Sequence, residues 1–259
     1  MNGSDLALTT HALRMAEMAS DTAMEFFHGR LGVAFKADES PVTQADKAVE
    51  TEVRRYLKTH FPEHGIFGEE HGVEGDPAGR MWIIDPIDGT RSFLSGHPLF
   101  GFLLAHLTGG SPDLGVIGMP ALKEVFLGVP GQGASLNGKP IKASGHTRLD
   151  QAILYVNEGD KLHRDHPALF DRLMQAGQTR RFGYDCYPHA LVAAGHVDAV
   201  IDYDLEPYDF LAVAAVVTAA GGVMTDWDGK ALNLGSDGRV VSAATPDLHA
   251  ELLDLVRGD

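Results

Sequence analysis

The segment Asp85-Pro86-Ile87-Asp88-Gly89-Thr90 carries the residues whose types and spacing best fit a chemical role. Its two carboxylates stand three residues apart, directly after the apolar run Met81–Ile84, which predicts a buried strand ending at the first of them. Pro86 favours extended backbone before it, and Gly89 permits a tight turn. Such a loop offers carboxylate oxygens to metal ions and, where a helix follows, main-chain N–H groups to a phosphate. The same pattern also fits a surface turn, so the segment alone leaves both interpretations open.

Two further acidic segments lie where they could join this loop. Gly68-Glu69-Glu70 follows a short apolar run, and Glu206-Pro207-Tyr208-Asp209 immediately precedes an apolar helix predicted from Phe210 to Ala220. Taken singly, the first fits a solvated loop. The second fits a helix cap, because an acidic residue there favours the helix dipole. In combination with residues 85–90, the two segments favour a shared acidic site.

The apolar pattern predicts alternating helices and strands that position these loops. A helical face recurs at steps of three and four residues from Leu8 to Phe26, and a second helix is predicted to begin near Thr43. Asn137-Gly138 predicts a hairpin turn, and Thr245-Pro246 predicts the cap of a last helix. The remaining predictions are strands at 81–84, 102–107, 114–117, 125–127, 153–156, 199–201 and 239–243 and helices at 167–175, 187–194 and 210–220.

The composition of the 259-residue chain is that of a folded, acidic protein. Hydrophobic residues make up 44% and charged residues 22%, which excludes a disordered chain. The 21 Lys and Arg against 36 Asp and Glu give a net charge of −15, which argues against nucleic acid or membrane as a partner and is compatible with binding cations. Cys186 is the single cysteine, which suits a reducing compartment. No targeting segment or membrane span is visible, so we expect a soluble cytoplasmic protein.

Four motifs in this order resemble the inositol monophosphatase-like family of magnesium-dependent phosphomonoesterases, over essentially the whole chain. They are Lys36-x-Asp38-x-Ser40-Pro41-Val42-Thr43-x-Ala45-Asp46, Gly68-Glu69-Glu70, Asp85-Pro86-Ile87-Asp88-Gly89-Thr90, and Tyr208-Asp209 before a helix ended by Gly221-Gly222. The resemblance implies an α+β fold, a layered αβαβα sandwich like that of inositol monophosphatase and fructose-1,6-bisphosphatase. We expect one domain over residues 1–259, with a soft division near residue 145 into a metal-loop lobe (1–145) and a substrate lobe (146–259). Tyr208 stands where many members have Trp, which we expect to alter the pocket wall and leave the chemistry intact.

The resemblance implies the ligands of two or three Mg²⁺ ions. Glu69, Asp85 and the carbonyl of Ile87 would bind one ion. Asp85, Asp88 and Asp209 would bind a second. These residue types suit Mg²⁺, which prefers hard oxygen ligands. Two such ions about 3.5–4 Å apart hold both the attacking and the leaving oxygen of an in-line displacement, so that no protein nucleophile is needed.

The resemblance also implies how the phosphate and the water are held. Gly89 and Thr90 would donate N–H groups to the phosphate, beside Asp209. Asp46 and Thr90 would help Glu69 to orient the attacking water. The protein would then be a metal-dependent phosphatase, a phosphoric monoester hydrolase acting on a small phosphorylated substrate.

Further motifs resemble the histidinol-phosphate phosphatase branch of this family. They are Arg91-Ser92-Phe93-x-Ser95-Gly96-x-Pro98-x-Phe100-Gly101, Asp185-Cys186-Tyr187 at a predicted helix start, and Glu206-Pro207-Tyr208-Asp209 with Tyr in place of Trp. The implied reaction is hydrolysis of L-histidinol phosphate in histidine biosynthesis, and similar proteins are commonly homodimers. This substrate carries an amine and an imidazole, so its pocket should offer carboxylates. Asp185 and Asp202 are the candidates, and the plainer alternatives are a helix cap and a solvated strand end.

Several alternatives stay open at this point. Within the same class, the substrate would be inositol-1-phosphate or another small phosphomonoester. From another class, the protein would be a catalytically weak regulatory or binding member, against which the complete set of four carboxylates argues. Asp202-Tyr203-Asp204 faintly resembles the nucleophile loop of haloacid-dehalogenase phosphatases but lies late in the chain. His163-x-x-His166 has a spacing found in metal sites, yet its charged surroundings predict a solvated loop.

Overall fold

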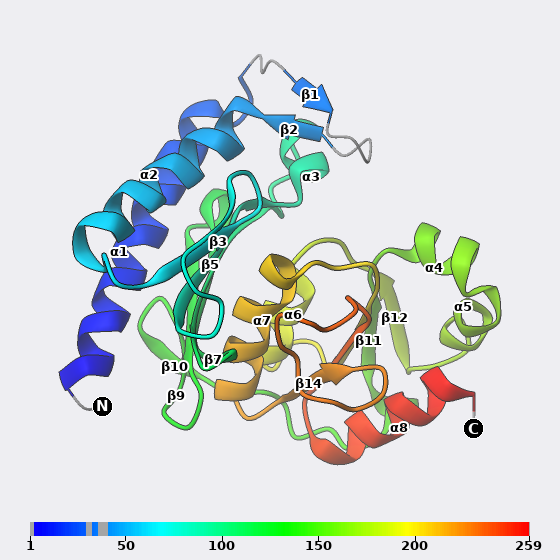
Figure 1. Cartoon of the computed structure of the whole chain (residues 1–259). Coiled ribbons are helices and arrows are strands. Elements are labelled where there is room, and N and C mark those ends of the chain that lie inside the picture. Colours follow the sequence, from blue (N-terminus) through cyan, green and yellow to red (C-terminus); the bar gives the residue numbers. More distant parts are fainter. Residues whose placement is uncertain (1–2, 30–32, 36–40, 259) are drawn as a thin grey trace.

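The computed structural model describes residues 3–29, 33–35 and 41–258 (Figure 1). Helices and sheets alternate in five layers through this part of the chain, which confirms the αβαβα order. The segment 36–40 of the first motif lies outside the described residues. Among the described helices, none combines the length and the hydropathy needed to cross a membrane.

The first layer consists of helices α1 (Gly3–Phe26) and α2 (Gln44–His60). Their apolar residues recur on one face, and that face packs against the neighbouring sheet. Ala12 and Met15 of α1 and Val53 of α2 are completely buried. Both predicted helices are therefore confirmed, together with the faces that they bury.

The second layer is an eight-stranded sheet in the order β10-β9-β8-β7-β6-β5-β3-β4. Its strands are β3 (Gly65–Gly68), β4 (Gly72–Glu74), β5 (Arg80–Asp88), β6 (Gly101–Thr108), β7 (Ser111–Met119), β8 (Glu124–Val129), β9 (Gly133–Leu136) and β10 (Lys139–Ile141). Asn137 and Gly138 join β9 to β10 with φ of 49° and 75°, the left-handed pair that a two-residue hairpin turn requires. Strands β3 and β5 are parallel neighbours, so their carboxyl ends lie at the same edge of the sheet.

Helices α6 (Tyr187–Ala193) and α7 (Pro207–Ala219) form the middle layer, between the two sheets (Figure 1). Residues 210–217 of α7 are all buried, because sheets cover the helix on both sides. The helix begins at Pro207 and not at Phe210 as predicted. Proline at a first helical position has no N–H to leave unsatisfied, so the helix starts there and takes Asp209 into its first turn.

The fourth layer is a five-stranded sheet in the order β12-β11-β13-β15-β14, and three helices cover its outer face. The strands are β11 (Ile153–Val156), β12 (Thr179–Phe182), β13 (Ala199–Asp202), β14 (Val223–Asp226) and β15 (Val240–Ala243), and the helices are α4 (Gly159–Asp165), α5 (Pro167–Leu173) and α8 (Pro246–Arg257). The cap of α8 is confirmed, since the Thr245 hydroxyl accepts a hydrogen bond from the N–H of Leu248 at 3.3 Å.

Two parts of this layer depart from the sequence prediction. Residues 159–165 form helix α4 and not the solvated loop predicted around His163, because Leu162 packs into the core beneath the sheet. The edge strand β12 has no counterpart among the predicted strands. Its sequence Thr-Arg-Arg-Phe is polar and mostly exposed, so its strand conformation depends on parallel pairing with β11.

Candidate active site

The loop 85–90 lies where β5 bulges and turns into the short helix α3 (Thr90–Leu94). The register between β5 and β6 shifts between Asp85 and Asp88. Strand β5 continues to Asp88, three residues beyond its predicted end. The Asp85 carboxylate accepts a hydrogen bond from the N–H of Ile87 at 3.0 Å. The Thr90 hydroxyl donates to the carbonyl of Ile87 at 3.2 Å and to the Asp46 carboxylate at 3.3 Å. These contacts hold the loop in one conformation with both aspartates near the edge of the sheet.

Three of the predicted metal ligands come together in space. Carboxylate oxygens of Asp85, Asp88 and Asp209 lie within 4.8 Å of one another. Asp209 reaches this cluster from the first turn of α7, where its other contact is the N–H of Glu206 at 2.7 Å. The segment Glu206–Asp209 therefore caps the helix and supplies a carboxylate to the cluster.

Burial raises the pKa of every carboxyl group in this cluster. The pKa of Asp209 rises to about 7, chiefly through burial, although the hydrogen bond from Glu206 acts in the opposite direction. Burial and then the charge of Glu69 raise the pKa of Asp85 well above its ordinary value. Burial and the charge of Asp185 do the same for Asp88. A set of crowded carboxylate ligands, of which Asp85 is buried and Asp88 and Asp209 are half-buried, fits a hard divalent cation, which would remove the mutual repulsion.

Glu69 stands at the rim of the same cluster. Its main chain pairs with β5, since its N–H donates to the carbonyl of Ile84 at 3.2 Å. The parallel pairing of β3 with β5 thus places Glu69 beside the end of the strand that carries Asp85. Asp46, in the first turn of α2, is buried behind Thr90.

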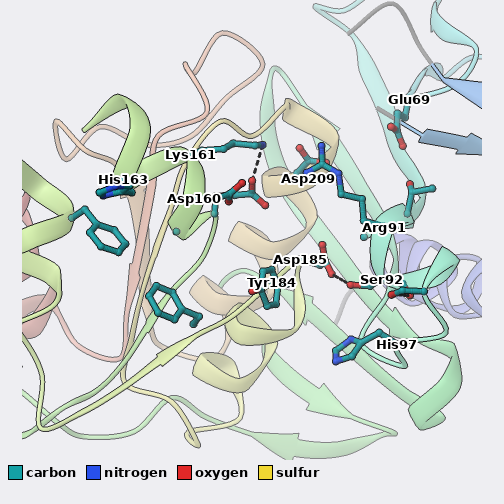
Figure 2. Close-up of a pocket in the computed structure, with 17 residues that line it drawn as sticks. Glu69, Arg91, Ser92, His97, Asp160, Lys161, His163, Tyr184, Asp185 and Asp209 are labelled. Carbon is teal, nitrogen blue, oxygen red and sulfur yellow. Dashed lines mark hydrogen bonds and ion pairs between the residues drawn. The ribbon is translucent and has the colours of Figure 1, made fainter. Parts of the chain in front are cut away.

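A cavity of about 990 Å³ opens in front of these residues (Figure 2). Figure 2 shows Glu69 and Arg91 on one side of it, His163 and Lys161 from α4 on the other, and Asp185 between them. A second, smaller cavity of about 130 Å³ adjoins it, and Asp88, Asp185, Asp202 and Asp209 all border this space. The inner edge of the site is therefore strongly acidic.

Asp185 lies directly over residues 85–90, the metal loop, although it is 95 positions from Thr90 in the sequence. Its carboxylate accepts a hydrogen bond from the Ser92 hydroxyl at 2.6 Å. A Cβ at position 89, where φ is 81°, would come within 2.5 Å of this carboxylate, so only glycine fits there. Burial raises the pKa of Asp185 to about 6, although the bond from Ser92 lowers it. Within the described residues, no side chain caps α6, so Asp185 is not the helix cap of the plainer alternative.

Asp202 is buried behind Asp185 and is not a solvated strand end. One of its carboxylate oxygens accepts from the amide of Asn157 at 2.7 Å and lies 3.0 Å from Nε2 of His189. The same Asn157 amide donates to the carbonyl of Asp185 at 3.1 Å, so it ties the two acidic positions together. The sequence assigned no role at the site to Ser92, which lies in the motif that begins at Arg91, or to Asn157 and His189, which lie in none of the motifs.

The two histidines of His163-x-x-His166 face different surroundings. His163 borders the large cavity, whereas the ring of His166 packs edge-on against Trp227, with centroids 5.3 Å apart. Among the described residues, the cluster of Asp85, Asp88 and Asp209 is the one group with metal-ligand spacing. Tyr208 packs edge-on against Phe67, with ring centroids 5.8 Å apart.

The five-layered fold and the carboxylate cluster at its sheet edge define a class, the metal-dependent phosphatases. A model of the inositol monophosphatase family matches residues 6–258. The chain belongs to the inositol monophosphatase family, as its motifs predict.

The similar proteins fall within this class and carry different substrate names. A histidinol-phosphatase of Chlorobaculum parvum is 39% identical over 234 residues, which cover 88% of this chain and 89% of the relative. The bifunctional phosphatase IMPL2 of Arabidopsis thaliana is 36% identical over 93% of this chain and 72% of its own length. The solved structure of an inositol monophosphatase from Zymomonas mobilis superposes with a TM-score of 0.89, at 35% identity, over 99% of this chain and all of the other. The fold and the phosphatase class are therefore confirmed.

Removal of divalent cations should make the stability of the protein fall as the pH rises from 6.5 to 8.5. A carboxyl group whose pKa is raised on folding, such as that of Asp209 at about 7, binds more protons in the folded than in the unfolded chain. The resulting penalty grows until the pH passes the folded pKa and then levels off, so within this range Asp209 acts at the lower end, together with Asp85 and Asp88, whose pKa is raised as well. Half-buried His64 and buried His249, whose pKa is lowered by burial first, would act mainly below this range.

Thermal unfolding in EDTA, followed by fluorescence, measures this effect. We expect the Tm to fall by about 5 °C across the range, and saturating Mg²⁺ to raise it more at pH 8.5 than at pH 6.5. A Tm in EDTA that stays constant or rises between these pH values would contradict the prediction.

Replacement of Thr90 by alanine should impair the chemical step more than substrate binding. The Thr90 hydroxyl joins Asp46 to the loop carbonyl, so we expect kcat and kcat/KM to fall together by about 10- to 100-fold, with little change in KM. Steady-state kinetics measure this, and Thr90→Ser, which keeps the hydroxyl, is the matched control. A defect confined to KM would show that Thr90 holds the substrate and does not orient the water.

Proposed function

We propose that the protein hydrolyses L-histidinol phosphate to L-histidinol and phosphate, a reaction of histidine biosynthesis. The observation that carries the proposal is the position of Asp185, a carboxylate that lies over Gly89 of the metal loop and borders the same cavity. The relatives described as histidinol-phosphatases support it, at 39% identity for that of Chlorobaculum parvum.

The cofactor of this proposal is Mg²⁺, with two or three ions per site. Glu69, Asp85, Asp88 and Asp209, with the carbonyl of Ile87, would hold the ions. The crowding of Asp85, Asp88 and Asp209 supports this, because their oxygens fit a hard cation. When bound, such ions activate a water molecule and stabilise the charge on the phosphoryl oxygens and the leaving alkoxide.

The residues of the chain have separate tasks in this reaction. The N–H groups of Gly89 and Thr90, at the start of α3, would hold the phosphate oxygens. Glu69, with Asp46 and Thr90, would orient the water whose oxygen attacks phosphorus opposite the leaving alcohol. The bond from phosphorus to the ester oxygen breaks, and the ester oxygen takes up a proton, so that overall the water supplies a hydroxyl group to the phosphate and a hydrogen to histidinol.

The specificity would come from the acidic inner edge of the site. Histidinol phosphate carries an amine and an imidazole, and charged acceptors in a buried pocket favour cations. Asp185 borders both cavities and Asp202 borders the smaller one, so both would face the alcohol part of the ligand. Contact of Asp202 with the ligand would add to the bonds that it already receives from Asn157 and His189.

The test is a substrate panel measured by phosphate release. We expect kcat/KM for histidinol phosphate to exceed those for inositol-1-phosphate, fructose-1,6-bisphosphate and adenosine 3′,5′-bisphosphate, with activity lost in EDTA. Preference for inositol-1-phosphate would replace the proposed substrate with the alternative that the Zymomonas mobilis structure favours. Absence of phosphate release from every ester would favour a regulatory or binding role.

Two smaller proposals accompany this function. We expect a homodimer, because the motifs resemble proteins that commonly form one, and light scattering of the purified protein tests it. We expect a cytoplasmic location on the basis of the single cysteine.

A further inference from the structure

Two aromatic side chains of the active-site cavity are unusually exposed. Phe182, at the end of β12, leaves 51% of its surface accessible, and Tyr184 leaves 57%. They are the two aromatic residues among the large exposed hydrophobic side chains of the described chain, and both border the cavity. In Figure 2, Tyr184 stands beside Asp185, on the side of the cavity away from Glu69.

The ring of Phe182 is held in place despite this exposure. It lies over Gly159, where a Cβ would come within 2.7 Å of its Cε1 atom. It also stacks on Phe170, with ring centroids 6.2 Å apart and planes 13° from parallel. The ring of His163 in turn meets Phe170 edge-on at 5.2 Å. An aromatic ring that is held in one position with a face exposed to water costs free energy. A ligand that covers this face removes the cost.

The charges around these aromatic side chains restrict the kind of ligand that fits the cavity. Lys161 is paired with Glu158 at 2.7 Å and with Asp204 at 3.1 Å, so its charge is compensated. Asp160 and Asp185 border the same cavity. The cavity volume of about 990 Å³ is at the upper end of the range for sites that enclose a small organic ligand. There is consequently room for a flat group beyond the phosphate, in surroundings that favour donors or positive charge.

We infer that Phe170, Phe182 and Tyr184 form an aromatic subsite for a planar ring in the alcohol part of the substrate. The inference rests on the proposed phosphatase function and extends it. It names the substrate class as phosphomonoesters whose alcohol carries a flat ring, and it names the residues that select this ring. Offset or edge-on contact between rings supplies the preference, and the neighbouring carboxylates add to it when the ring is a cation.

The experiment compares two neutral esters, 2-phenylethyl phosphate and 2-cyclohexylethyl phosphate, which share a carbon skeleton and differ in the flatness of the ring. In the wild-type protein with Mg²⁺, we expect kcat/KM to be at least about twofold higher for the phenyl ester. Phe182→Leu and Tyr184→Leu should each lower the ratio of the two kcat/KM values by about 2- to 10-fold. Phe182→Tyr, which keeps the flat face, should preserve the ratio.

A further variant displaces the ring without removing it. Gly159→Ala adds a Cβ beneath Phe182 and should lower the ratio as Phe182→Leu does. A wild-type protein that hydrolyses the phenyl ester no better than the cyclohexyl ester would overturn the subsite. An unchanged ratio in both leucine variants would do the same.

These outcomes are separate from those for histidinol phosphate, because neither ester carries an amine. A phenyl preference that depends on Phe182, in a protein that prefers inositol-1-phosphate to histidinol phosphate, would support the subsite and overturn the proposed substrate. A preference for histidinol phosphate together with an unchanged ester ratio would support the substrate and overturn the subsite.

Discussion

The Asp85→Asn variant should fold and lose nearly all phosphatase activity. Asp85 is 2% exposed, and a carboxylate oxygen of it lies within 4.8 Å of those of Asp88 and Asp209. In the proposed site it would contact two ions, whose stabilisation of transition-state charge amounts to several kcal/mol. We therefore expect kcat to fall at least about a thousandfold in saturating Mg²⁺.

The same substitution should leave the metal-free protein at least as stable as the wild type. The charges of Glu69, Asp88 and Asp209 all raise the pKa of Asp85, after burial itself, so a neutral amide relieves repulsion. Asp150→Asn is the matched control, because Asp150 forms an exposed ion pair with Arg148 far from the cluster in the sequence. Retention of a near wild-type kcat by Asp85→Asn would show that the assignment of Asp85 as a ligand of both ions is wrong.

The Asp185→Asn variant should change which substrate the enzyme prefers. If Asp185 faces the cationic part of histidinol, its loss should cost about 1.5–3 kcal/mol of transition-state binding, about 10- to 150-fold in kcat/KM for histidinol phosphate. Inositol-1-phosphate and glycerol phosphate lack this cation, so their kcat/KM should fall much less. The measured quantity is the ratio of kcat/KM between the cationic and the neutral substrates.

Two other roles for Asp185 predict an unchanged ratio. A role in holding the loop, through Ser92 and over Gly89, would reduce every activity together. So would a general electrostatic effect on the metals, because the charge of Asp185 raises the pKa of Asp88. Ser92→Ala separates the positioning contact from the charge, since it removes the hydroxyl and keeps the carboxylate. An unchanged ratio in Asp185→Asn would remove Asp185 from substrate recognition and leave the histidinol proposal to rest on similarity.

Local patterns in the sequence determined most of the elements of this fold. The helical faces of α1 and α2, the Asn137-Gly138 hairpin and the Thr245 cap all depend on contacts within a few residues, or on one repeating face. Glu69, Asp85 and Asp209 could be named for a similar reason, because their short motifs resemble a known family. Functional residues that must be close neighbours along the chain form short motifs, and such motifs can be recognised in a single sequence.

The tertiary structure alone decided what surrounds the metal loop. Asp185 meets Ser92, which is 93 positions away in the sequence, and Asn157 meets Asp202, which is 45 positions away. The wall opposite Glu69 comes from α4 and β12, one predicted as a loop and the other not among the predicted strands. Polar segments of this kind have little periodicity of their own, and they become ordered by pairing with β11 and by packing Leu162 against the second sheet. Burial then raises the pKa of Asp185 and Asp209, because desolvation is a property of the assembled layers and of no single segment.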